Sequence, residues 1–207
     1  MSNRYVYGIV ESDEGLAFET DAVGGADRVY PVEHRRLAAV VSDIDTTEPE
    51  ETDEDAKRHD EVLRELMERD GGRTVVPMQF GMVFESDRAL KNVLRGARPA
   101  FRRTMNDVEG TVELGVKVVR EEDADVDREA VVEDVSERLE SIADGSVENG
   151  LFSDRLVLNR SYLVDRDDRE AFDEAVATLE ESYDDLIFKY SGPFAPYSFV
   201  DVHIGAQ

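Results

Sequence analysis

The sequence contains no cysteine, and this absence excludes several kinds of chemistry. Without cysteine the chain can form no disulfide bond, use no thiolate nucleophile and bind no metal through sulfur. Lysine is also scarce, because the 24 basic residues are 20 arginines and only four lysines, Lys57, Lys91, Lys117 and Lys189. A reducing or redox-indifferent compartment suits a chain of this composition.

Long apolar runs are missing as well. The first ten residues contain no basic region followed by an apolar core, as a secretory leader would. No apolar run reaches the roughly eighteen residues that a membrane-spanning helix needs. We therefore expect a soluble, cytoplasmic protein without a membrane partner.

Acidic residues dominate the charge of the chain. The 49 acidic residues against 24 basic ones give a net charge of -25. Such a polyanion repels phosphate backbones, so we expect no nucleic-acid partner. In molar salt the screening length falls to roughly 3 Å and the self-repulsion of the surface largely disappears. The composition indicates either an ordinary acidic, solvated surface or adaptation to a salt-loaded cytoplasm, and we favour the second.

The least charged stretch is Thr74–Phe84, and the surrounding elements are organised around it. Its apolar run is too continuous for a surface loop, while Pro77 and Gly81 interrupt it, so we predict a buried strand that turns sharply. An amphipathic helix precedes it, with Thr52 as the N-cap and a stop at Gly71-Gly72. A second helix follows it, capped by Ser86 and kinked or restarted at Pro99.

The periodicities predict an α+β protein of two small sheet-plus-helices domains, 1–106 and 107–207. The first sheet is expected to contain these segments: 5–10, 29–32 and 37–41. In the second domain we expect a half-buried strand at 111–119 and a helix from Val131 to Ile142. Further elements are expected as follows: a strand at 156–164, a helix opened by a capping box of Asp167 and Glu170, a strand at 186–190 and a last strand from Tyr197 to His203. This order departs from the ferredoxin-like one, so the predicted fold is a modified ferredoxin-like domain.

Residues for catalysis do not stand out. His34, His59 and His203 lie in three different segments without metal-ligand spacing, and we expect each at the surface or at its boundary. With 49 carboxylates, no acid pair is specific enough to suggest general acid–base work. The glycine pairs lack the context of a phosphate loop. We predict no enzyme, no catalytic residue, no metal site and no cofactor.

Aromatic rings beside glycine and proline form the more distinctive pattern. Such a frame holds rings in place at little entropic cost, and rigid rings are common anchors of protein–protein contacts. The simpler interpretation is that these rings are core, which we favour for Phe80 and Phe199. The residues predicted to form a protein interface are Pro77, Phe80, Phe84, Gly192, Pro193, Phe194, Pro196 and Tyr197.

Several segments together resemble the gas vesicle protein F/L family, and the resemblance covers nearly the whole chain. The similar segments are Tyr5–Val10, His59–Val62 leading into Val76–Phe84, Asn159–Val164 and Gly192–Val200. The second and last of these motifs are specific. In the closing turn the family often has tryptophan and proline, where this chain has Phe194 and Ala195, which preserve the turn.

The resemblance implies a two-domain α+β accessory protein of gas vesicles, with no enzymatic activity. It also implies contacts with the hydrophobic shell protein of the vesicle and with other accessory proteins. One alternative is a general interaction module that scaffolds accessory proteins without touching the shell protein. Another is a small-molecule enzyme on a ferredoxin-like frame, which a deep polar pocket would support.

Overall fold

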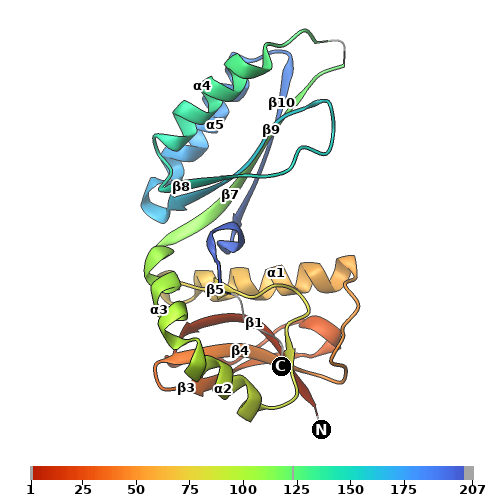
Figure 1. The fold of residues 1–207 in the computed structure, drawn as a ribbon, viewed down its shortest axis with the longest axis vertical. Coiled ribbons are helices and arrows are strands. Elements are labelled where there is room, and N and C mark those ends of the chain that lie inside the picture. Colours follow the sequence, from red (N-terminus) through yellow and green to blue (C-terminus); the bar gives the residue numbers. More distant parts are fainter. Residues whose placement is uncertain (1, 123, 203–207) are drawn as a thin grey trace. The chain divides into compact units, whose positions relative to one another are not determined.

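Two compact units make up the chain (Figure 1). The computed structural model describes residues 2–122 and 124–202. Of the described residues, the first unit comprises 2–110 and 195–202, and the second comprises 111–122 and 124–194. Each unit combines helices with an antiparallel sheet, which confirms the predicted α+β class. Among the described residues, no helix has the length and apolar character needed to cross a membrane.

The first sheet is built around its N-terminal strand. β1 (Asn3–Glu11) pairs antiparallel with β4 (Leu37–Ile44), and β3 (Arg28–His34) and β2 (Phe18–Glu19) follow on that side. Both long strands are almost entirely buried, because helices cover the two faces of the sheet. Pro31 lies in β3, whose outer neighbour β2 pairs over only two residues, so little ladder is lost at the proline.

The uncharged stretch 74–84 lies along the other side of β1, as two short strands. β5 (Val76–Pro77) pairs with Gly8 and Ile9, and β6 (Val83–Phe84) pairs with Arg4 and Tyr5. Between them the chain turns through Gly81, whose φ of 86° is in the left-handed region that glycine adopts without strain. The predicted sharp turn is therefore present, but the stretch forms two short strands rather than one, and only Val75–Met78 and Phe84 within it are buried.

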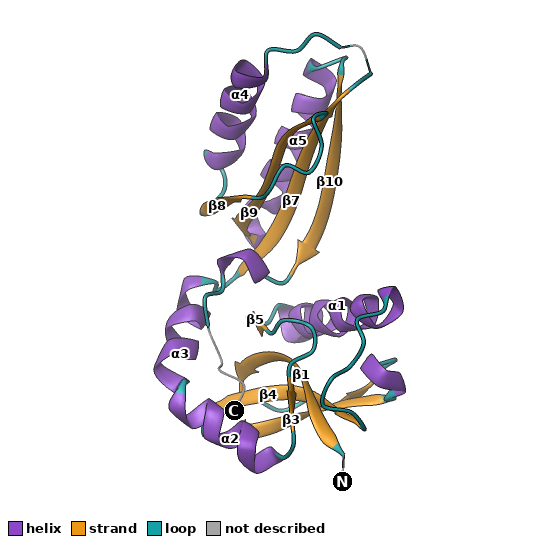
Figure 2. Ribbon diagram, turned by 45° about the vertical axis from the view of Figure 1, so that its right-hand side comes forward, coloured by secondary structure: helices purple, strands orange, loops and turns teal. Residues whose placement is uncertain are grey.

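Three helices cover this sheet. α1 (Asp53–Glu68) packs on one face, and α2 (Asp87–Gly96) and α3 (Arg98–Asp107) pack on the other (Figure 2). The predicted caps are present, because the hydroxyls of Thr52 and Ser86 accept hydrogen bonds from the backbone amides of Asp55 and Ala89. Pro99 sits in the first turn of α3, so the helix restarts there.

The second unit has the ferredoxin-like order of elements. Its elements are β7 (Thr111–Arg120), α4 (Arg128–Glu140), β8 (Gly145–Glu148), β9 (Leu156–Asp165), α5 (Arg169–Ser182) and β10 (Leu186–Phe194). They form a sheet with the order β10-β7-β9-β8. The expected departure from the ferredoxin-like order of elements was wrong, because β8 was not predicted from the sequence. That strand has four residues and alternates between half-buried and exposed positions, so it leaves no apolar signal.

Two further predictions about the second half of the chain are corrected. The capping box of Asp167 and Glu170 does not form: a 3₁₀ turn, Arg166–Asp168, precedes α5, and the side chain of Asp165 accepts from the amide of Asp167. In place of the last strand, Tyr197–Phe199 forms a 3₁₀ turn that follows Pro196. His203 lies outside the described residues.

The assignment of all of 107–207 to one domain is corrected as well. The side chain of Ala195 is buried in the core that α1 forms with the first sheet. In the described residues, the chain from Ala195 onward therefore belongs with the first unit.

The core of the second unit follows the predicted alternation. Val112, Leu114, Val116 and Val118 of β7 all point into the cluster that the helices cover. Val131, Val135 and Leu139 of α4 meet them, as the helical spacing predicted. The helix ends at Glu140, before Ile142, which packs only partly against the cluster.

Gly192 in β10 offers a test of this packing. Its φ is 116°, and a Cβ atom there would lie 2.9 Å from the carbonyl oxygen of Glu113. We expect Gly192→Ala to lower the free energy of unfolding by about 1–3 kcal/mol, because both the backbone conformation and the contact disfavour a side chain. Urea unfolding at constant molar salt measures the effect. Gly150→Ala is the control, since a Cβ at Gly150 meets no atom within 4 Å; equal stability of the two variants would contradict the argument.

Candidate functional site

The eight residues predicted to form an interface come from both units and differ in exposure. Pro77, Phe84 and Pro196 are buried and offer little surface to a partner. Gly192 is exposed, and the remaining four are half-buried: Phe80, Pro193, Phe194 and Tyr197. Their use as an interface stays a prediction. Two of them, Phe80 and Tyr197, meet at a third residue that the prediction did not include, His59.

His59 lies at the centre of this cluster and is only 2% exposed. Its Nε2 is 3.0 Å from the carbonyl oxygen of Met78, and its Nδ1 is 2.8 Å from the hydroxyl of Tyr5. A carbonyl can only accept, so Nε2 carries the proton and the Tyr5 hydroxyl donates to Nδ1. These two bonds attach α1 to the stretch 74–84 and to β1.

The imidazole of His59 is held neutral. Burial lowers its pKa to about 4, and the hydrogen bond to Met78 only partly opposes this shift. A charged imidazolium would leave Nδ1–H facing the Tyr5 hydroxyl in a site closed to water. The expectation that His59 lies at the surface or its boundary was wrong. Its spacing from Val62, Leu63 and Leu66 places it on the apolar face of the helix, and that spacing is the signal by which the sequence could have identified it.

Aromatic rings enclose the imidazole. The centroid of Tyr7 stacks 5.3 Å from it, and those of Tyr5, Phe80 and Tyr197 lie at 5.6, 5.9 and 6.3 Å. Burial raises the pKa values of both buried tyrosines, so they stay protonated. The Tyr7 hydroxyl bonds Ser42 and the amide of Val23 at 2.9 Å each. Polar groups at the centre are therefore paired, and the rings of Phe80 and Tyr197 form the partly exposed rim.

Tyr197 connects the C-terminal segment to α1. Its hydroxyl donates to the carboxylate of Asp60 at 3.2 Å. Burial raises the pKa of Asp60, and this hydrogen bond partly offsets the shift. The half-buried ring of Tyr197 is thus held in one orientation at the edge of the cluster, as an anchor for a partner requires.

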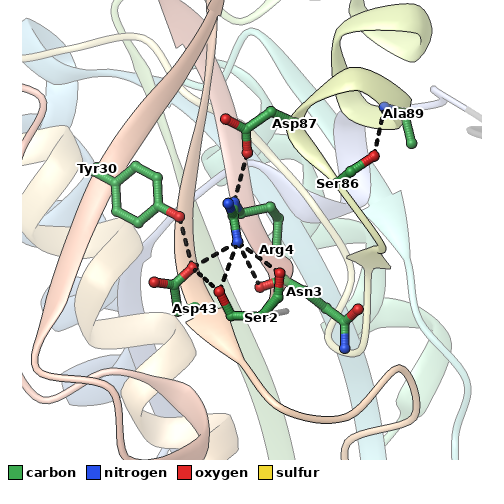
Figure 3. Close-up of polar contacts among 8 residues, drawn as sticks. All are labelled: Ser2, Asn3, Arg4, Tyr30, Asp43, Ser86, Asp87 and Ala89. Atoms are coloured by element: carbon green, nitrogen blue, oxygen red, sulfur yellow. Dashed lines mark hydrogen bonds and ion pairs between the residues drawn. The ribbon is translucent and has the colours of Figure 1, made fainter.

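A second polar cluster lies at the start of β1 (Figure 3). The guanidinium of Arg4 donates to Asp87 at 2.6 Å and to Asp43 at 2.8 Å, and the Tyr30 hydroxyl also donates to Asp43. These bonds join β1, β3, β4 and the first turn of α2. The cluster therefore links three strands of the sheet to the helix that packs on it.

The arrangement around His59 suits binding better than catalysis. The imidazole has no access to solvent, and both of its nitrogens are occupied. In the part of the chain that the structure describes, no group of three or more histidine, aspartate or glutamate side chains is placed to hold a metal ion. What the cluster supplies is a rigid support for the rings of Phe80 and Tyr197.

The buried imidazole should make the stability of the first unit depend on pH. The unfolded state takes up a proton near pH 6.5, and the folded state does so only near pH 4. Between these values the unfolded chain binds more protons, so acid destabilises the fold. We expect the free energy of unfolding of the wild type to fall more steeply than that of His59→Gln, by up to about 1.4 kcal/mol per pH unit. Urea unfolding of both proteins from pH 7 to 4 measures this difference. Equal dependence of the two free energies of unfolding on pH would contradict a buried neutral imidazole.

Comparison with known proteins places this architecture in a family. The family model described as gas vesicle synthesis protein GvpL/GvpF matches residues 3–128 and 119–201. Gas vesicle protein F of Haloferax mediterranei is 55% identical over 99% of this chain and 96% of its own length. Gas vesicle protein F1 of Halobacterium salinarum is 53% identical over the same shares.

Solved structures agree on the fold. The crystal structure of gas vesicle protein GvpF from Anabaena sp. PCC7120 superposes with a TM-score of 0.87 at 18% identity, covering 100% of this chain and 99% of that one. The GvpF structure from Microcystis aeruginosa gives 0.85 at 16% identity, covering 97% and 99%. With both domains and nearly every residue matched, the chain belongs to the gas vesicle synthesis protein GvpL/GvpF family.

Proposed function

We propose that this chain is an accessory protein of gas vesicle assembly that binds the hydrophobic shell protein of the vesicle and other accessory proteins. The observation that carries the proposal is the full-length likeness to proteins named gas vesicle protein F. The family description names vesicle synthesis and no reaction, which supports a binding role. Its place of action is the cytoplasm and the growing gas vesicle.

Half-buried rings support the binding of an apolar partner. Phe80 and Tyr197 form the rim of the His59 cluster, and Phe194 ends β10 in the second unit. Such rings are ordered before binding, so burying them against a partner costs little entropy. Exposed apolar patches larger than a few hundred Å² invite aggregation, and a carrier would shield the shell protein in this way.

The acidic exterior supports the same role. A net charge of -25 keeps a complex soluble even when one member is strongly apolar. In molar salt this charge is screened beyond roughly 3 Å, so it does not oppose close contact with a partner. The alternative is a scaffold that binds accessory proteins only, and the burial of Pro77, Phe84 and Pro196 favours it by reducing the apolar surface.

Co-expression with the shell protein tests the proposal. The tagged chain is recovered in molar salt without detergent, and we expect the shell protein to accompany it. Phe194→Asp should reduce the recovered shell protein about tenfold, because a carboxylate replaces an apolar anchor. Cells with this variant should contain few or no vesicles.

Leu151→Asp is the matched control, since it places the same carboxylate at an exposed apolar side chain outside the predicted interface. It should recover as much shell protein as the wild type does. Circular dichroism confirms that both variants are folded. If the folded wild type recovers no shell protein but still recovers other accessory proteins, the scaffold is the better account.

A further inference from the structure

The face of the second sheet opposite its helices carries a group of side chains that the proposed function does not use. α4 and α5 lie on one side of this sheet (Figure 1), where Val116, Val118 and Phe188 point into the core. Side chains alternate along a strand, so Lys117 of β7 and Lys189 of β10 point to the other side. A groove of about 360 Å³ lies there.

The charge of this groove is opposite to that of the protein. Its lining residues are Lys117, Val119, Phe152, Ser153, Arg155, Leu156, Ile187 and Lys189. Three of them are basic and none is acidic, although acidic residues outnumber basic ones by 49 to 24 in the chain. The groove also holds two of only four lysines. We call it the basic groove.

The two lysines of the groove repel each other electrostatically. Lys117 and Lys189 are directly opposite each other in the β7–β10 ladder. Like charges at such a position destabilise a sheet by roughly 0.2–1 kcal/mol. Among the residues that the structure describes, no carboxylate lies within ion-pair distance of either lysine. A carboxylate from outside the chain would relieve the repulsion.

Exposed apolar side chains border the same lysines. Phe152 is 76% exposed, and Lys117 Nζ lies 5.5 Å from the centroid of its ring. Ile187, in the groove itself, is 40% exposed. Aromatic residues are enriched at the centres of protein interfaces. The groove therefore offers cationic and apolar contacts side by side.

We propose that the basic groove binds an acidic peptide segment of another protein. One carboxylate of the segment lies between Lys117 and Lys189, and a neighbouring apolar side chain packs against Phe152 and Ile187. In molar salt only charges within about 3 Å of contact retain their attraction, so the apolar contact holds the segment while the lysines select acidic side chains. The site lies within the second unit and does not depend on binding of the shell protein.

Other occupants fit less well. A nucleic acid would bring a phosphate backbone towards a body of charge -25, which three basic side chains do not offset. A two-fold dimer through the groove would place lysines against lysines. A second copy that instead offers its acidic 43–55 segment makes a head-to-tail contact, which leads to rings or open chains of this protein. A different acidic protein avoids both difficulties.

Fluorescence anisotropy with the full chain tests the proposal. The probe is a short fluorescein-labelled peptide that alternates aspartate with leucine, measured in molar salt. Lys117→Glu with Lys189→Glu should weaken binding about tenfold or more, because two attractive contacts become repulsive. The like-charge pair is retained, so the stability of the sheet should change little. Phe152→Ala should weaken binding about tenfold through loss of the ring.

The matched control is Lys57→Glu with Lys91→Glu, which changes the net charge equally but in the first unit. Lys57 is exposed and pairs with Glu61 on the same helix, so this variant should fold and bind the probe within about twofold of the wild type. A peptide with serine for leucine should bind weakly, and one with lysine for aspartate should not bind.

Four outcomes would overturn the proposal. The first is equal weakening of peptide binding by the two double-lysine variants. The second is tighter binding of the lysine peptide than of the acidic peptide, and the third is stronger binding of oligothymidylate than of the acidic peptide. The last is concentration-dependent self-association of the protein that Lys117→Glu with Lys189→Glu abolishes. The first would make net charge the cause of binding. The last would make a second copy the occupant.

Discussion

The hydrogen bonds of the His59 imidazole hold the first unit together at its centre. Through them α1 is joined to β1 at Tyr5 and to the uncharged stretch at Met78. β1 in turn pairs with β4 on one side and with both short strands of that stretch on the other. A neutral ring with one donor and one acceptor is needed there, because neither a charge nor an unpaired polar atom is tolerated in a dry site. The cluster also supports the partly exposed rings of Phe80 and Tyr197.

Charge divides the surface of the protein into a large acidic part and a few exceptions. The acidic part keeps the chain soluble and, in salt, exerts little force beyond contact. Two of these exceptions are the aromatic rim near Tyr197 and the basic groove around Lys117 and Lys189. They belong to different units and differ in chemistry, one being apolar and the other both cationic and apolar. A protein with two such surfaces can hold two different partners, which suits an accessory role in the assembly of a larger particle.

The sequence predicted local features more reliably than relationships between distant segments. The caps at Thr52 and Ser86, the restart at Pro99 and the alternation along β7 were all correct. Each depends on residues within a few positions of one another, so periodicity and capping chemistry could predict them, although the capping box at Asp167 and Glu170 did not form. The resemblance to the family was also correct, because its motifs cover nearly the whole chain. Around the candidate site, the sequence singled out Phe80 and Tyr197, whose use as an interface stays a prediction, and it wrongly placed His59 at the surface.

The amino-acid sequence by itself determined the α+β class, most of the helices and long strands, and the acidic character of the surface. Only the tertiary structure decided that β8 completes a ferredoxin-like sheet, that the chain from Ala195 onward packs with the first unit, and that Lys117 faces Lys189. The physical reason is the separation along the chain of the residues that determine each feature. Backbone conformation and amphipathic faces depend on neighbours along the chain, whereas burial of His59 and the charge of a groove depend on strands and helices that meet only after folding.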